Sequence, residues 1–135
     1  MKIIVTGATG HIGSYLIRDL GLQFKESEIV MIDNMMTQRF ASLFKLPKLG
    51  NYSFIEGDVR LMDLNSVFNG ADIVIHLAAI TDAAGSFDKA LEVEENNYQS
   101  TLKVANACLE TGASLIALSS TSVYGTQKDV VDEDC

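Results

Sequence analysis

The first thirteen residues constrain the fold of this 135-residue chain more than any other stretch. An apolar run at residues 3–5 leads into a loop with glycines at positions 7, 10 and 13, and helical spacing of apolar residues follows over 12–20, with Gly21 expected to end the helix. A strand, a glycine turn and a helix form the first half of a βαβ unit. Because glycine has no Cβ atom, the backbone of such a turn can approach a pyrophosphate at the helix N-terminus. The opening therefore predicts a nucleotide-binding α/β fold.

The rest of the chain continues the alternation of strands and helices. Apolar runs predict strands over residues 28–33, 52–56, 72–79 and 114–119. Helical spacing predicts helices within residues 38–45, over 63–70 and over about 86–111. This alternation is typical of a parallel sheet with helices on both faces. We expect one domain over residues 1–135, an α/β Rossmann-type doubly wound sheet of order 3-2-1-4-5, truncated after strand five, with its ligand over the carboxyl ends of the strands.

Composition and charge argue against several classes of function. The net charge of -8 does not suit a surface that follows nucleic-acid phosphates. The two cysteines, Cys108 and Cys135, cannot build a disulfide framework or a zinc quartet, and no metal site is expected. The chain begins directly with a strand rather than a signal peptide, and no apolar run approaches membrane-spanning length. We therefore expect a cytoplasmic protein that binds neither nucleic acid nor membrane.

Asp33 is the residue that narrows the choice of nucleotide. It ends the second predicted strand, twenty residues beyond Gly13, where a carboxylate can accept hydrogen bonds from an adenosine ribose. A carboxylate there would repel a ribose 2′-phosphate, so NAD is favoured over NADP, although Arg39 could soften that preference. The alternative is an aspartate that only forms a turn or caps a helix. Of the two histidines, His11 is expected to offer its backbone N–H, and His76 to pack inside a strand.

Several motifs resemble those of the extended short-chain dehydrogenase/reductase superfamily, in its nucleotide-sugar epimerase/dehydratase branch. The matching segments are Thr6-Gly-Ala-Thr-Gly-His-Ile-Gly13, Asp33-Asn34, Gly57-Asp-Val-Arg60, His76-Leu-Ala-Ala79, Asn97-Tyr-Gln-Ser-Thr101 and Ser119-Ser-Thr-Ser-Val-Tyr-Gly125. They resemble, in that order, the family's TGxxGxxG loop, the acidic end of its second strand, its adenine-contacting segment, its HxAA strand end, its NxxGT helix motif and its SSxxVYG motif. The resemblance thus extends along the whole chain.

The resemblance implies NAD as cofactor and a nucleotide sugar as substrate. It implies that Asp58 and Val59 contact adenine, and that Ser120 takes the place of the catalytic Ser/Thr that hydrogen-bonds the substrate oxygen. For Ser120 the alternative is a hydroxyl that caps backbone groups of a loop. The residues expected to bind the cofactor are Gly7, Gly10, His11, Ile12, Gly13, Asp33, Asn34, Asp58, Val59, Leu77, Ala78, Ala79, Asn97 and Ser119.

The chemistry implied by the resemblance needs residues beyond these. A sugar hydroxyl is oxidised by hydride transfer to NAD, and the ketone is re-reduced or eliminates water, with a tyrosine base whose pKa a lysine lowers. That pair belongs to a YxxxK motif on the helix after strand five, whereas this chain ends at Cys135. Tyr124 and Lys128 match the spacing, but Gly125 places Tyr124 in a loop rather than on a helix. We therefore expect the N-terminal, cofactor-binding part of a longer enzyme.

Three functions remain open at this point. The first is the NAD-dependent epimerase or dehydratase, which in this family commonly forms a homodimer. The second is a non-catalytic NAD-binding module that senses redox state, and the third, ranked last because its glycines are spaced more tightly, is a SAM-dependent methyltransferase. Ser119 and Ser120 at the strand end favour the enzyme, while Ser100 and Leu61 depart from the family pattern. The identity of the sugar and the choice among epimerisation, dehydration and oxidation stay open.

Overall fold

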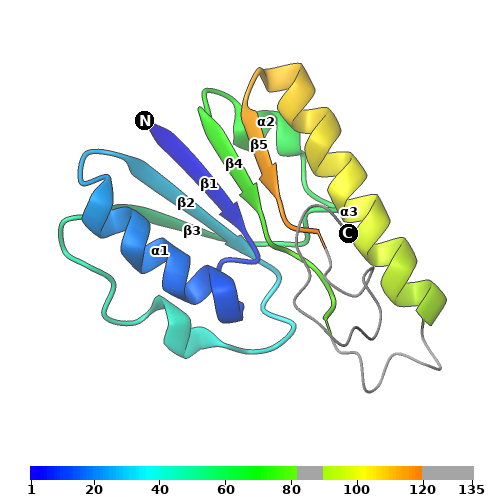
Figure 1. Ribbon diagram of the computed structural model, residues 1–135, viewed down its shortest axis with the longest axis horizontal. Coiled ribbons are helices and arrows are strands. Elements are labelled where there is room, and N and C mark those ends of the chain that lie inside the picture. Colours follow the sequence, from blue (N-terminus) through cyan, green and yellow to red (C-terminus); the bar gives the residue numbers. More distant parts are fainter. Residues whose placement is uncertain (82–89, 120–135) are drawn as a thin grey trace, which may run out of the picture.

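The structure, a computed structural model, describes residues 1–81 and 90–119 as a parallel sheet between two layers of helices (Figure 1). In chain order its elements are β1 (Lys2–Thr6), α1 (His11–Gln23), β2 (Glu28–Asp33), the 3₁₀-helix η1 (Phe40–Leu43), β3 (Asn51–Glu56), α2 (Leu64–Phe68), β4 (Ile73–His76), α3 (Ala90–Thr111) and β5 (Ser114–Ala117). The described strands lie in the order β3-β2-β1-β4-β5, and each neighbouring pair is parallel. The predicted fold class and strand order are confirmed.

β1 occupies the centre of the sheet because its residues are apolar on both faces. Ile3 and Val5 pack with α1, whereas Ile4 packs in a second core with α2 and α3. From α1 the first core receives Ile17 and Leu20. A strand buried on both faces is what a central parallel strand requires.

The two cores occupy the faces of the sheet, so the candidate site lies at an edge of the sheet. Figure 1 shows α1 and η1 on one face of the sheet, α2 and α3 on the other, and α1 beginning where the strand arrowheads end. The loops that follow β1, β2, β3 and β4 therefore share one rim, at the carboxyl ends of the strands. Among the described helices, none combines the length and the apolar character needed to span a membrane.

Several boundaries differ from expectation for reasons of packing. α1 continues through Gly21 to Gln23, so the prediction that Gly21 ends the helix is wrong. Gly21 is buried, and a Cβ atom there would lie 1.7 Å from the hydroxyl oxygen of Tyr52, which donates a hydrogen bond to the carbonyl of Ile17. The glycine thus serves close packing of α1 on β3.

Other elements are shorter than expected. The helix predicted within residues 38–45 is only a 3₁₀ turn, η1, and β4 ends at His76 rather than at residue 79. β5 ends at Ala117 rather than at residue 119. The expected start of the long helix, near residue 86, lies outside the described residues, which resume within α3.

Candidate functional site

The loop between β1 and α1 is wound so tightly that two of its positions admit only glycine. Gly7 has a φ of +67°, and a Cβ atom there would lie 2.7 Å from the backbone nitrogen of Ala78. A Cβ atom at Gly13 would lie 2.3 Å from the carbonyl oxygen of Gly7. The backbone N–H of Gly10 donates to that same carbonyl at 3.1 Å. The loop therefore presents bare backbone at the rim.

The N-terminus of α1 is open to an anion. Gly10 is the N-cap, no side chain caps the helix, and the first turn carries no acidic residue. The N–H groups of His11, Ile12 and Gly13 have no acceptor within the helix, and the helix dipole adds partial positive charge there. His11 and Ile12 are exposed. Unpaired N–H groups next to a glycine cradle suit a pyrophosphate.

Asp33, at the end of β2, is held in place by two backbone N–H groups. Its Oδ2 accepts from the N–H of Thr9 at 3.0 Å, and its Oδ1 accepts from the N–H of Met35 at 2.9 Å. Met35 is buried with a φ of 55°, which few non-glycine residues adopt, and so fixes the turn after the strand. Each carboxylate oxygen keeps a further lone pair. Asp33 is thus an oriented acceptor beside the glycine loop.

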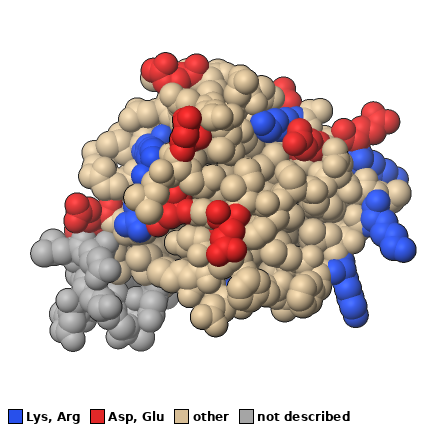
Figure 2. Space-filling view, turned by 180° about the vertical axis from the view of Figure 1, so that it is seen from behind, with Lys and Arg blue, Asp and Glu red and all other residues tan. Residues whose placement is uncertain are grey.

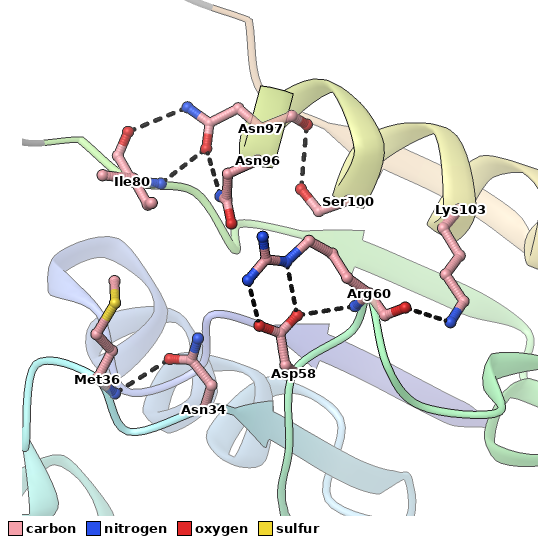
Figure 3. Close-up of polar contacts among 9 residues, drawn as sticks. All are labelled: Asn34, Met36, Asp58, Arg60, Ile80, Asn96, Asn97, Ser100 and Lys103. Carbon is pink, nitrogen blue, oxygen red and sulfur yellow. Dashed lines mark hydrogen bonds and ion pairs between the residues drawn. The ribbon is translucent and has the colours of Figure 1, made fainter. Parts of the chain in front are cut away.

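Asp58, which follows β3, faces Arg60 across a short turn (Figure 3). Arg60 Nη2 donates to Oδ2 at 2.7 Å, and Arg60 Nε and its backbone N–H donate to Oδ1 at 3.1 and 2.9 Å. These bonds are the main reason that the pKa of the Asp58 carboxyl lies below its usual value, and the side chain of Asn34 acts in the same direction. Asp58 is therefore ionised, an acceptor, at neutral pH. Val59 is buried in the core, so only its backbone can face a ligand.

The end of β4 is tied to the glycine loop through Thr6. The Thr6 hydroxyl oxygen accepts from the N–H groups of Leu77 and Ala78, each at 3.3 Å, and lies 2.7 Å from His76 Nδ1. Which of the two groups donates in this short hydrogen bond depends on the tautomer of His76. Burial lowers the pKa of His76. His76 is 5% exposed, and this agrees with the expectation that it packs inside the sheet.

Asn97 on α3 binds the backbone of the loop that follows β4 (Figure 3). Its Oδ1 accepts from the N–H of Ile80 at 2.8 Å, and its Nδ2 donates to the carbonyl of Ile80 at 3.0 Å. Oδ1 also accepts from Nδ2 of Asn96 at 3.0 Å. The amide is thus engaged by protein groups, and it pairs with the whole peptide unit of one rim residue. Ser100, in place of the family's glycine, is buried and donates back to the carbonyl of Asn97 at 3.1 Å.

The remaining predicted residues divide between the rim and the part of the chain that is not described. Ala79 is exposed at the rim after β4, and Ser119 is exposed after β5. Ser120, and with it the Tyr124 and Lys128 pair, lies outside the described residues. Within residues 1–81 and 90–119, no group of three or more His, Cys, Asp or Glu side chains is placed to hold a metal ion.

Three residues at this rim were not predicted as site residues. Arg60 stands two positions after Asp58, so the spacing offered a signal for the ion pair. Thr6 and Lys103 act through bonds to backbone groups that are distant in sequence, and such bonds leave no pattern in the chain. Figure 2 shows that basic side chains are dispersed among acidic ones on the face it displays, without one continuous basic patch.

Comparison with known proteins shows the family of the chain. The profile of the NAD dependent epimerase/dehydratase family matches residues 3–135. A UDP-glucose 4-epimerase of Klebsiella pneumoniae is 35% identical over 96% of this chain and 96% of that protein. A Bacillus subtilis protein described as an uncharacterized UDP-glucose epimerase is 34% identical over 99% of this chain and 44% of its own length.

A solved structure shares the fold closely. The UDP-glucuronic acid 4-epimerase of Bacillus cereus, in complex with UDP-glucuronic acid and NAD, superposes with a TM-score of 0.87 at 33% identity, covering 99% of this chain and 45% of that one. The present chain therefore spans less than half the length of this structure and of the Bacillus subtilis protein. With a family profile matched almost from end to end, the chain belongs to the NAD-dependent epimerase/dehydratase family.

Proposed function

We propose that residues 1–135 form the NAD-binding part of a nucleotide-sugar epimerase or dehydratase. The observation that carries the proposal is the bond between the N–H of Thr9 and Asp33 Oδ2, 3.0 Å long, which joins the glycine loop to the carboxylate. A pyrophosphate subsite and a ribose acceptor are thereby held as one unit. The names of relatives, which include UDP-sugar epimerases and a complex with NAD, support the same conclusion.

Each part of the rim would hold one part of the cofactor. The backbone at Gly7, Gly10 and Gly13, with the first N–H groups of α1, would bind the pyrophosphate. Asp33 would accept hydrogen bonds from the adenosine ribose and repel a 2′-phosphate, with Asn34 beside it. Asp58 would accept from the adenine amino group and Val59 would contact the ring through its backbone. Residues 77–79 would line the ribose side.

When bound, NAD supplies a hydride acceptor and, in its reduced form, a hydride donor. The residues of this chain bind and orient it, and Ser120, flanked by Ser119, would hydrogen-bond the sugar oxygen. We propose none of the described residues as the tyrosine base or its lysine partner. We place the enzyme in the cytoplasm with a nucleotide sugar as its substrate, and a homodimer as its form.

Calorimetric titration of the 135-residue chain with NAD, NADP and S-adenosylmethionine tests the proposal. We expect NAD to bind at least about tenfold more tightly than NADP, because burying a phosphate beside a carboxylate costs more than about 1.4 kcal/mol. S-adenosylmethionine should not bind. Asp33→Asn should abolish the preference, and Glu28→Gln, at the opposite end of the same strand, should leave it intact. Equal affinity for both dinucleotides, or an unchanged preference in Asp33→Asn, would overturn the assignment.

The coding sequence beyond codon 135 separates the enzyme from a redox-sensing module. A YxxxK motif on a helix that follows the fifth strand would support the enzyme, because hydride transfer needs a base at the sugar hydroxyl. A coding sequence without that motif, in a chain that still binds NAD, would support the sensor.

A further inference from the structure

A lysine outside the predicted site holds the turn that carries Asp58. Lys103, on α3, donates from Nζ to the carbonyl oxygens of Arg60 and Met62, each at 2.7 Å. Figure 3 shows the Lys103 ammonium reaching the backbone of Arg60 while the Arg60 side chain turns the other way, towards Asp58. Both bonds are charge-assisted, and such bonds are stronger than those between neutral groups.

Hydrogen bonds within the turn connect the Lys103 contact to the position of Asp58. The N–H groups of Leu61 and Met62 donate to the carbonyl of Asp58 at 2.9 and 3.1 Å, and the N–H of Arg60 donates to its carboxylate. Asp58 therefore organises the N–H groups of the turn, and Lys103 binds two carbonyls at its other end. The turn lies between these two anchors. Lys103 is partly buried, so water competes less for the same carbonyls.

We propose that Lys103 is a positioning residue for the adenine subsite. The inference rests on the proposed function, in which the Asp58 carboxylate accepts a hydrogen bond from the adenine amino group. Because the turn is already ordered before binding, NAD binding does not include the entropy cost of ordering the turn. The same helix holds the next rim loop through Asn97 and Ile80, so α3 braces two neighbouring loops of one cofactor site.

The test compares NAD with nicotinamide hypoxanthine dinucleotide, which has an oxygen in place of the adenine amino group. The wild-type chain should prefer NAD by about tenfold, the worth of one hydrogen bond to a charged acceptor. Lys103→Met keeps the length of the side chain without its donors, and it should reduce this preference to about twofold. Its affinity for the hypoxanthine analogue should change little. Lys103→Arg, which keeps the charge and the donors, should retain the preference.

The outcomes distinguish this inference from the proposed function. If the wild type shows no preference for NAD over the analogue, the adenine subsite itself is wrong. If the wild type prefers NAD and Lys103→Met keeps the same preference, or loses affinity for both ligands equally, Lys103 is only structural. Lys48→Met, at an exposed position, is the charge-matched control and should behave as wild type. Should Lys103→Met not fold, Lys103→Gln keeps neutral N–H donors without the positive charge and should give an intermediate preference.

Discussion

Gly7 and Gly112 have similar backbone angles but differ in the space that a side chain would find. Their φ angles are similar, +67° and +75°, but a Cβ at Gly7 would meet the backbone of Leu77 and Ala78 at 2.7 Å, while a Cβ at Gly112 would meet nothing within 4 Å. Gly7→Ala should therefore destabilise the fold by about 3 kcal/mol, from backbone strain and overpacking together. Urea unfolding measures this loss.

Gly112→Ala is the matched control for backbone strain alone. It should cost only about 1 kcal/mol, and it should leave NAD affinity unchanged because Gly112 lies at the other end of the sheet from the glycine loop. Gly7→Ala should also weaken NAD binding, since the end of β4 would have to move away from the loop. Equal stability losses in the two variants would show that steric contact at Gly7 is unimportant.

His76 gives the stability of the protein a dependence on pH. Burial holds the pKa of His76 below its usual value, so the unfolded chain binds a proton at a higher pH than the folded chain does. The contribution of His76 is complete above the unfolded pKa of about 6.5 and is lost as the pH falls below it. The free energy of unfolding should decline there with a slope of at most about 1.4 kcal/mol per pH unit from this residue.

Two variants isolate this effect in urea titrations between pH 7.5 and about 5, a range that spans the usual histidine pKa. His76→Gln removes the titrating group and should flatten the curve. Asn106→Gln, which introduces the same residue at an exposed position on α3, should retain the wild-type slope. A wild-type slope that persists in His76→Gln would assign the dependence to other groups.

The sequence indicates candidate ligand-binding residues more readily than residues that hold the backbone of the site in place. Gly13 and Asp33 could be singled out as candidates because their spacing from a strand expresses a requirement of the ligand directly, and the structure joins their loops through Thr9. Their contact with a cofactor stays a prediction. Lys103 could not be singled out, because a bond from a side chain to distant carbonyls imposes no spacing on the chain. Asn97 is expected to contact the cofactor, and that role stays a prediction; the structure adds that its amide binds Ile80, which the sequence did not indicate.

The elements were predictable where a strand is buried on both faces. The apolar runs of β1 and β2 indicated the positions of both strands, and their place inside the sheet follows the order expected for a Rossmann-type fold. The end of α1 was not predictable, since Gly21 makes room for Tyr52 instead of ending the helix. η1 is a 3₁₀ turn flanked by residues of positive φ, Gln38 and Lys45, which the sequence does not signal.

The contact between α3 and the loop after β4 leads to a prediction about how two elements are held. Asn97→Leu should destabilise the protein by about 1 to 3 kcal/mol, because the N–H and carbonyl of Ile80 would lose their partners in a partly buried place. Asn97→Asp keeps an acceptor for the N–H but sets a carboxylate against the carbonyl, so it should also destabilise. Urea unfolding monitored by circular dichroism measures both.

The control for this contact lies on the same helix. Asn106 is exposed on α3, so Asn106→Leu should change stability by no more than about 0.5 kcal/mol. If Asn97→Leu were as mild as Asn106→Leu, the bonds to Ile80 would contribute nothing net, and α3 could not be said to hold the rim loop.

At the scale of the whole molecule, the sheet is covered unevenly. β3 and β5 are its outermost strands, and no described strand pairs with the outer side of either. Ile116 and Leu118 are 50% and 59% exposed although they follow the apolar pattern of a covered strand. An unpaired strand edge with apolar neighbours tends to pair with another chain. Among the described residues, β5 and these two side chains therefore form an apolar edge of the sheet.

We expect this chain to self-associate through β5 in a concentration-dependent manner. Sedimentation velocity over a hundredfold concentration range should show a rising weight-average sedimentation coefficient, because edge pairing buries both the backbone groups and the apolar side chains. Ile116→Lys should shift the association to a higher concentration, since a charge would then have to be buried at the edge. Leu22→Lys, which alters an equally exposed apolar residue on α1, is the control and should associate as wild type does. A monomer at every concentration would contradict the prediction, and an equal effect of both variants would mean that association depends on general surface hydrophobicity rather than on the edge of the sheet.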